Sequence, residues 1–430
     1  MAAALGVLVS CGSVKSGEEV VAASRDSKVV VAYVTSWSEV MPDPQYMTHI
    51  NYAFGHVNES FNGVKIDNEE RLRQIVDLRK QKPELKVLLS IGGWGSGRFS
   101  EMAANDEYRR AFAADCDRVV KEFALDGIDI DWEYPTSSMA NISSSPDDTE
   151  NFTLLMQDIR AAIGNEKELT LATVASARYI DFKAILPSVD FVNIMAYDMA
   201  SAPKHHSALY PSGHSGDITS DGAVTAHLKA GVPPSKLVMG MPFYGRGGDG
   251  YPSFQDYNKV GNTDTQYTEK WDEVAQVPYL ADKNDTLVFG FENPRSLAIK
   301  CQYILDKDLL GGMYWDYSGD NEQGDLRRTV AENLLGKPHK AKVLVLTERG
   351  GQHGGFTDAG LKWLAAEGAK GNFSITEINN ARNITEAYLS QFSLVIQLDF
   401  PPYTWPKEAE DAFVKYIEEG GGGWIGFHHA

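Results

Sequence analysis

Short β-rich runs, most of them continuously apolar, recur through residues 28–336 and alternate with segments of helical periodicity. Uninterrupted apolar runs are typical of parallel strands that are buried on both faces. The segments between them, such as TENFTLLMQDIRAAIG, carry apolar residues three and four positions apart, as amphipathic helices do. The runs are KVVVAYV, HINYAF, LKVLLSIGG, GIDIDWEY, LTLATVAS, FVNIMAYD, KLVMGMPFYG and GGMYWDYSG. Eight strand–helix units predict an α/β fold of the (β/α)8 TIM-barrel type.

A second α/β pattern occupies residues 341–430. It opens with the strand-like run AKVLVLTE, and the runs FSLVIQLDF and GGWIGFHHA follow with helix-like segments between them. This order predicts an open, flavodoxin-like α/β domain. Because an α/β domain rarely ends on a buried strand, we expect residues 341–430 to form only the N-terminal part of such a domain, that is, a partial one.

The run DGIDIDWEYP places Asp129, Asp131 and Glu133 at alternate positions. In an extended strand this spacing puts all three carboxyl groups on one face, while Ile and Trp occupy the other. Carboxyl groups this close cannot all ionise, so we expect at least one raised pKa. A row of carboxyl groups that shares protons at a strand end is typical of a general acid.

Two other interpretations of the acidic run are a solvated edge strand and a divalent-cation site. An edge strand does not need Ile and Trp on its second face, followed by Tyr134 and Pro135. A magnesium or calcium site usually takes its oxygen ligands from a more polar loop. We therefore interpret the run as catalytic, and we expect no metal and no cofactor.

Net charge restricts the class of partner. The chain has 40 basic and 59 acidic residues, a net charge of −19. Nucleic-acid binding needs a basic surface, so we expect no nucleic-acid partner. The negative charge suits a soluble surface and a neutral or cationic substrate.

The first residues, MAAALGVLVSCGS, form a short apolar run that ends near Cys11. A small residue before a Cys, after an apolar stretch, resembles a bacterial lipoprotein signal, in which the Cys carries the lipid. We expect residues 1–27 to be a signal and polar tether, with membrane attachment through lipidated Cys11 and a secreted or cell-envelope location (periplasmic or outer-membrane). The alternative is a frayed apolar terminus. Cys116 and Cys301 lie in helix-like segments, and we expect them to pack as small hydrophobic residues.

The motifs DGIDIDWEYP, SIGGW, MAYD, GMPFYGR and MYWDYSGD together resemble glycoside hydrolase family 18, and within it the chitinases. The resemblance covers roughly residues 28–335, and its acidic pattern D-x-x-D-x-D-x-E is highly specific. It implies hydrolysis of β-1,4-linked N-acetylglucosamine polymers or oligomers with retention of configuration. The implied substrate is chitin or a chitooligosaccharide.

The resemblance also implies a role for each residue of the site. Glu133 is the acid that protonates the glycosidic oxygen. Asp131 holds the acetamido N–H of the substrate and stabilises an oxazolinium intermediate, and Asp129 shares a proton with Asp131. Tyr197 binds the acetamido carbonyl, and Trp315 lies beneath the sugar at the −1 position. The other substrate-binding residues that the resemblance implies are Tyr33, Phe54, Gly93, Trp94, Met195, Asp198, Tyr244 and Arg246.

The spacing of the carboxyl groups agrees with this mechanism. An ordinary retaining glycosidase needs a nucleophilic carboxylate about 5–5.5 Å from the acid, across the sugar. Asp131 instead lies on the same strand face as Glu133, which suits a helper, so the 2-acetamido group of the substrate becomes the nucleophile. Two alternatives are an endo-β-N-acetylglucosaminidase that cleaves the chitobiose core of N-glycans and a sugar-binding barrel without catalysis. Non-catalytic members of the family usually lack the acid that Glu133 provides.

Many processive chitinases carry an α+β insertion between the seventh and eighth barrel strands, which forms a wall of the cleft. Residues 247–310 separate the matching motifs here, and much of that length is expected to be helix and its approach. We therefore expect the insertion to be absent or vestigial and the cleft to be shallow. Among the tryptophans near strand ends, we expect only Trp94 and Trp315 to line the cleft.

The stretches VLVLTERGGQHGGF and GGGWIGFHHA resemble ThuA-like (trehalose-utilisation) domains, relatives of the class I glutamine amidotransferases. At the position of the amidotransferase nucleophilic Cys, this chain has His428 and His429, so we expect no thiol nucleophile. A metal or sugar role for these residues and His353 is the weaker interpretation. A carbohydrate-binding or structural appendage is the stronger one.

Overall fold

The computed structural model describes residues 28–248, 251–260, 267–336, 341–347, 354–368, 373–382, 384–399 and 405–427. The predictions for Cys11, His353, His428 and His429 fall outside these ranges. No helix within these ranges has both the length and the apolar character that crossing a bilayer requires.

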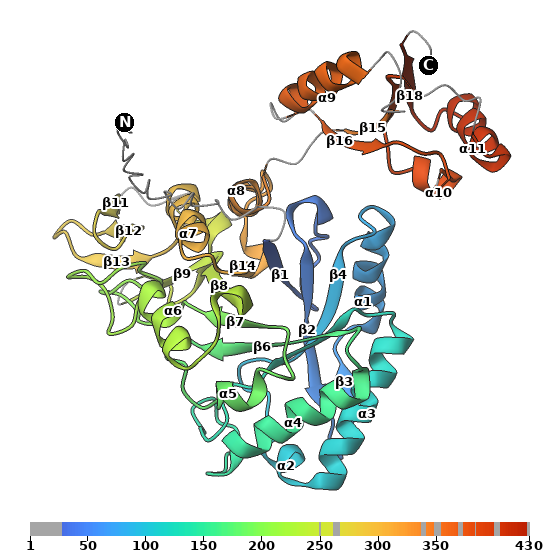
Figure 1. Ribbon diagram of the computed structural model, residues 1–430. Helices are drawn as coiled ribbons and strands as arrows, with labels where there is room; N and C mark the ends of the chain where they lie inside the picture. The colour runs from blue at the N-terminus through green and yellow to red at the C-terminus, as the bar shows by residue number, and fades with distance from the viewer. Residues whose placement is uncertain are drawn as a thin grey trace, which may run out of the picture.

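Eight parallel strands close into a barrel (Figure 1). In sheet order they are β1 (Val29–Thr35), β14 (Gly311–Trp315), β8 (Leu237–Pro242), β7 (Phe191–Met195), β6 (Glu168–Val174), β5 (Gly127–Asp131), β4 (Lys86–Gly92) and β2 (His49–Val57). β2 pairs with β1 and completes the ring. β3 (Val64–Ile66) extends the sheet as an antiparallel neighbour of β2. The predicted TIM barrel and its strands are confirmed.

Helices surround the barrel between successive strands (Figure 1). They are α1 (Glu69–Val76), α2 (Phe99–Ala104), α3 (Asp106–Glu122), α4 (Asp148–Ile163), α5 (Phe182–Ile185), α6 (Ser220–Lys229), α7 (Pro294–Asp306) and α8 (Asp325–Leu334). Short 3-10 helices cover Pro44–Tyr46, Asp77–Lys80, Pro234–Lys236, Tyr257–Lys259 and Tyr317–Gly319. Side chains fix the helix starts: Asn105 caps α3, and Asn293 forms a capping box at the start of α7. Cys116 and Cys301 are buried in α3 and α7, as predicted.

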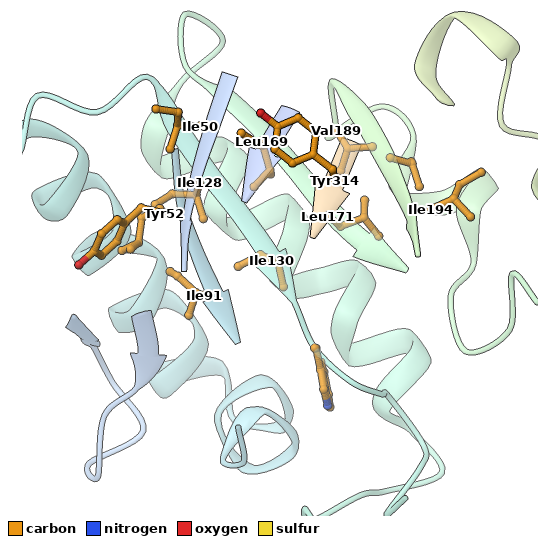
Figure 2. Close-up of a cluster of buried hydrophobic side chains, with 14 of the residues drawn as sticks. Ile50, Tyr52, Ile91, Ile128, Ile130, Leu169, Leu171, Val189, Ile194 and Tyr314 are labelled. Atoms are coloured by element: carbon orange, nitrogen blue, oxygen red, sulfur yellow. The ribbon is translucent and has the colours of Figure 1, made fainter. Parts of the chain in front are cut away.

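The two faces of β5 have different surroundings. Ile128 and Ile130 are completely buried in the apolar cluster that Figure 2 shows, and Trp132 belongs to the same cluster. Asp129 and Asp131 lie on the opposite, inner face of the barrel strand. Burial of each large apolar side chain contributes about 1.5–3 kcal/mol. The outer face therefore fixes the register that aims the acids inward.

Along the chain, an antiparallel five-stranded sheet is inserted between β8 and α7. Its strands are β10 (Gln255–Asp256), β9 (Tyr244–Gly247), β13 (Leu287–Gly290), β12 (Val277–Ala281) and β11 (Thr268–Asp272), in that sheet order. The prediction that the insertion is absent or vestigial was wrong. Segments such as TEKWD and VPYLA pair as antiparallel strands, while α7 begins only at Pro294. The prediction of a shallow cleft thereby loses its basis.

The C-terminal region forms a separate α/β unit (Figure 1). Its parallel four-stranded sheet has the order β16 (Ser374–Ile378), β15 (Lys342–Leu346), β17 (Leu394–Gln397) and β18 (Gly423–Gly426). Its helices are α9 (Gly354–Gly368), α10 (Glu386–Leu389) and α11 (Lys407–Glu418). Counted along the domain, this order is 2-1-3-4, which confirms the flavodoxin-like prediction. β18 is an edge strand with exposed residues, so the expected burial of the last strand was wrong.

Candidate active site

Asp129 is completely buried inside the barrel. Its carboxyl group accepts hydrogen bonds from Thr170 Oγ1 at 2.6 Å, Tyr33 OH and Ser90 Oγ at 2.8 Å each, and Asn193 Nδ2 at 3.3 Å. Burial raises the pKa of Asp129, and these hydrogen bonds oppose the rise because they stabilise the carboxylate. The donors come from β1, β4, β6 and β7, so the barrel itself positions this acid.

Asp131 is only 4% exposed, yet it lines the central cavity. Its Oδ1 has no hydrogen-bond partner among the described residues. Burial raises the pKa of Asp131 well above its usual range, and the charges of Glu133 and Asp129 raise it further. A buried polar atom without a partner is costly, so Oδ1 is well placed to bind a polar group of a ligand.

Glu133 lies just beyond the end of β5, is partly exposed and lines the same cavity. Burial raises the pKa of Glu133 to about 7, and the charge of Asp198 acts in the same direction, whereas a hydrogen bond with Tyr134 acts against it. A carboxylic acid with such a pKa retains its proton near neutral pH and can donate it. The spacing of the acids in the sequence had predicted a raised pKa of this kind.

Asp198 follows β7, and its carboxylate contacts the side chains of Arg246 and His206. Arg246 donates to both of its carboxylate oxygens, at 2.7 Å each, and a ring nitrogen of buried His206 lies 3.5 Å from Oδ1. Burial alone would raise the pKa of Asp198, but Arg246 and His206 hold it well below its usual range. Asp198 is therefore an ionised carboxylate whose two oxygens are already occupied.

Aromatic rings form the side of the cavity at β14, β1 and β2. Phe54 stacks on Trp315 with ring centroids 5.6 Å apart, and Tyr33 contacts Trp315 at 5.7 Å. Trp37, which the sequence had not placed at the cleft, lies 6.5 Å from Trp315 and is 63% exposed. Exposed aromatic faces of this kind suit the apolar faces of sugar rings.

The central cavity has a volume of about 550 Å³. The predicted residues among those that line it are Tyr33, Phe54, Trp94, Asp131, Glu133, Met195, Tyr197, Asp198, Tyr244, Arg246 and Trp315. Asp129 lies beneath them. Gly93 is not part of the lining, because it packs against Phe54: a Cβ atom there would lie 2.7 Å from that ring, and its φ is +92°. The structure shows close packing of Gly93 against the Phe54 ring, and its role in substrate binding stays a prediction.

Several residues that line the cavity were not predicted from the sequence. They are Tyr134, Met139, Ala172, Val174, Ala175, Ser176, Arg178, Tyr179, Met199, Ile218 and Phe254. Most follow β5 or β6 in loops without a motif, whereas Phe254 belongs to the insertion that the sequence did not predict. Tyr134 was the exception, because its position directly after Glu133 in the run DGIDIDWEYP was a usable signal.

Two further observations bear on alternative sites. A larger cavity, about 960 Å³, lies among Met41, Tyr257, Tyr317, Arg327 and their neighbours, and the β5 acids are not part of its lining. Within the described part of the chain, no three His, Cys, Asp or Glu side chains gather as a set that could hold a metal ion. The 550 Å³ cavity thus combines the perturbed acids with the aromatic wall.

Comparison with known families gives two matches along the chain. Residues 29–320 match the model of the glycosyl hydrolases family 18, and residues 342–430 match the model named for trehalose utilisation, ThuA. Chitinase A1 of Niallia circulans is 30% identical over 409 residues, which cover 70% of this chain and 58% of that protein. Chitotriosidase-1 of Mus musculus is 31% identical, over 69% of this chain and 74% of that protein.

Solved structures agree with these matches. A family 18 N-acetylglucosaminidase from Paenibacillus barengoltzii superposes with a TM-score of 0.66 at 32% identity, over 71% of this chain and 99% of that one. The group IV chitinase of Ostrinia furnacalis in complex with allosamidin gives a TM-score of 0.64 at 29% identity, over 71% of this chain and 96% of that one. The similarity therefore extends over the whole barrel.

Proposed function

The chain belongs to family 18 of the glycosyl hydrolases, and we propose that it hydrolyses β-1,4-linked N-acetylglucosamine polymers or oligomers with retention of configuration. One observation carries the proposal. The cavity contains a raised-pKa acid, Glu133, but neither of its other lining carboxyl groups, Asp131 and Asp198, is placed as a free nucleophile. The nucleophile must then come from the substrate, as in substrate-assisted glycosidases.

Each of the two remaining carboxyl groups is unsuited to attack for its own reason. Asp198 is bound on both oxygens by Arg246. Asp131 lies on the same strand face as Glu133. Its raised pKa keeps it protonated at pH values at which an ordinary aspartate is ionised. A displacement mechanism needs an ionised carboxylate across the sugar from the acid.

The proposed reaction assigns a role to each group. Glu133 donates its proton to the glycosidic oxygen as the bond from that oxygen to the anomeric carbon breaks. The carbonyl oxygen of the 2-acetamido group attacks the anomeric carbon and forms an oxazolinium ion, while Oδ1 of Asp131 accepts the acetamido N–H. A water molecule, deprotonated by Glu133, then attacks the anomeric carbon. This attack opens the oxazolinium ring and restores the acetamido group. Burial raises the pKa of Tyr197, and the charges of Asp131 and Glu133 raise it further. The Tyr197 hydroxyl therefore keeps its proton and can donate a hydrogen bond to the acetamido carbonyl.

Known relatives support chitin as the substrate class. Proteins named chitinase or chitotriosidase match two thirds of the chain or more, although the chain spans only 58% of the length of Chitinase A1. A second candidate is release of single sugars, because the Paenibacillus barengoltzii relative is described as an N-acetylglucosaminidase. Cleavage of N-glycan cores uses the same acids and is a third outcome of the assay below.

The test is product analysis on defined substrates. The protein is incubated with N-acetylglucosamine tetramers to hexamers and, separately, with a high-mannose glycoprotein, and the first products are followed by NMR. We expect oligomer cleavage with the β-anomer formed first. Release of glycan from the glycoprotein alone, or α-anomer formed first, would contradict the proposal. Accumulation of monomer from the earliest time points would instead identify the second candidate.

We further propose attachment to a bacterial cell envelope through lipidated Cys11. The support is the lipoprotein-like signal in the sequence. Metabolic labelling with a radioactive fatty acid should mark the wild-type protein and leave the Cys11→Ser variant unlabelled. Equal labelling of both would rule the proposal out.

A further inference from the structure

The cleft has a defined direction across the mouth of the barrel. In the closed ring of strands, β14 lies opposite β5, and β1 lies opposite β6. Trp315 ends β14, whereas Glu133 follows β5. If the proposed function holds, the sugar that supplies the acetamido group lies over Trp315, so the sugar that leaves lies toward the rim formed by the β4, β5 and β6 loops.

The wall at that rim is aromatic. Tyr134 and Tyr179 stack with ring centroids 5.5 Å apart and an interplanar angle of 15°, and Trp94 meets Tyr134 edge-on at 6.5 Å. Arg178 follows β6, and its guanidinium carbon lies 5.3 Å from the centroid of the Tyr179 ring. Its Nε donates a 2.9 Å hydrogen bond to Ser176 Oγ. These two contacts hold an otherwise exposed guanidinium against the wall.

The charge of Arg178 is not compensated locally. Of the two arginines in the cavity lining, Arg246 is paired with Asp198. For Arg178, the described part of the chain contains no carboxylate at ion-pair distance, and its contacts there are Ser176 and Tyr179. Arg178 lines the cavity at this rim, so its charge acts on whatever occupies the leaving-group side.

We propose that Arg178 is a specificity-determining residue that disfavours a glucosamine unit, which carries an ammonium group, on the leaving-group side of the cleft. This inference rests on the proposed function. The leaving sugar takes no part as nucleophile, so its acetamido group is not required by the chemistry. Two unit charges about 6 Å apart in a water-exposed site repel enough to change relative rates roughly threefold.

The discrimination on the two sides of the cleavage point then has two different causes. On the Trp315 side, a deacetylated sugar cannot react because it lacks the internal nucleophile. On the Arg178 side, a deacetylated sugar is still reactive but is repelled by a like charge. The first effect is independent of salt, whereas the second weakens as ionic strength rises.

The experiment uses partially deacetylated chitosan. Products are sequenced by mass spectrometry, and two quantities are recorded: the acetylation of the new reducing ends, and the share of glucosamine among the first two sugars at the new non-reducing ends. We expect acetylated reducing ends in every variant. The glucosamine share should rise roughly threefold in Arg178→Gln and further in Arg178→Glu, and stay at the wild-type value in Arg178→Lys.

Two controls separate charge at the cleft from other effects. Arg110→Gln removes the same charge from an exposed site on α3 and should leave the glucosamine share unchanged. In about 1 M salt, where the screening length is about 3 Å, wild type and Arg178→Glu should converge. Equal glucosamine shares in wild type, Arg178→Gln and Arg178→Glu at low salt would overturn the inference. Absence of cleavage, or deacetylated reducing ends, would instead overturn the proposed function.

Discussion

Arg246 donates two hydrogen bonds of 2.7 Å to the carboxylate of Asp198, from Nε to Oδ1 and from Nη2 to Oδ2. Asp198 follows the barrel strand β7, whereas Arg246 lies on β9 of the antiparallel insertion. The pair therefore joins the insertion to the barrel mouth. It also fixes a negative charge whose field acts on Glu133.

Replacement of the acid is the first prediction. Glu133→Gln should lower kcat by about 10²–10⁴-fold, because the amide cannot donate the proton that the leaving oxygen needs. Binding of an N-acetylglucosamine oligomer, measured by calorimetry, should change little. Glu150→Gln, at an exposed position of α4, is the matched control and should retain wild-type kcat. Substantial turnover by Glu133→Gln would exclude Glu133 as the acid.

The pH profile of wild type and Asp198→Asn is the second prediction. In the proposed mechanism Glu133 must be protonated to act, so log kcat/KM of the wild type should fall with a slope of −1 above its pKa of about 7. The charge of Asp198 raises that pKa, so its removal should lower it, and the alkaline limb should move to lower pH by about 0.5–1 unit. A limb that stays in place, or moves to higher pH, would contradict the electrostatic role of Asp198.

The third prediction concerns stability at different pH values. The folded-state pKa of Glu133 is about 7, above the ordinary glutamate value of 4.5. Between these values the folded chain binds more protons than the unfolded chain, so the free energy of unfolding falls as pH rises and levels off above about 7. Glu133→Gln removes this pH-dependent loss of stability, because Gln does not titrate. Its Tm should therefore exceed that of the wild type by about 2 °C at pH 8 and by less at pH 4. A difference that is constant with pH would argue against a buried, raised-pKa acid.

A buried ion pair gives the fourth prediction. Lys300 of α7 binds Glu292, and both side chains are inaccessible to solvent. The Lys300 ammonium also donates to the carbonyl oxygen of Ser207, next to His206. Lys300→Met leaves Glu292 buried without its cation and should lower the free energy of unfolding by about 3–5 kcal/mol.

The double variant Lys300→Met, Glu292→Leu tests the cause of that loss. With both charges removed, most of the stability should return, because no uncompensated charge stays buried. Denaturant unfolding of the single and double variants measures both values. If the double variant is as unstable as the single one, the pair acts through packing rather than through charge.

The sequence allowed prediction of the barrel because most of its strands are continuous apolar runs. The orientation of the β5 acids was equally predictable from the sequence, since their alternation with Ile128 and Ile130 determines which way they face. The insertion was missed because strands such as Thr268–Asp272 are short, polar and half-exposed, and their stability comes from antiparallel neighbours far along the chain.

The site was predictable where a motif marked it. Arg178, Tyr179 and Met139 reach the cavity from loops whose course depends on the tertiary structure, so no local pattern identified them. Gly93 belongs to a motif, and the structure adds a reason for its small size that the motif did not give: it allows the close approach of the Phe54 ring.

The ring contact between Tyr33 and Trp315 joins the first barrel strand to the last, and β1 pairs with β14 beside it. During synthesis, the acid strand and the partners of Asp129 leave the ribosome long before residue 315. A nascent chain that ends before β14 thus has the proposed proton donor but lacks Trp315, the proposed floor under the reacting sugar. Under the proposed function, activity is then gained in a single late step, when the final strand enters the sheet, and an incomplete product of translation carries the acids without the activity.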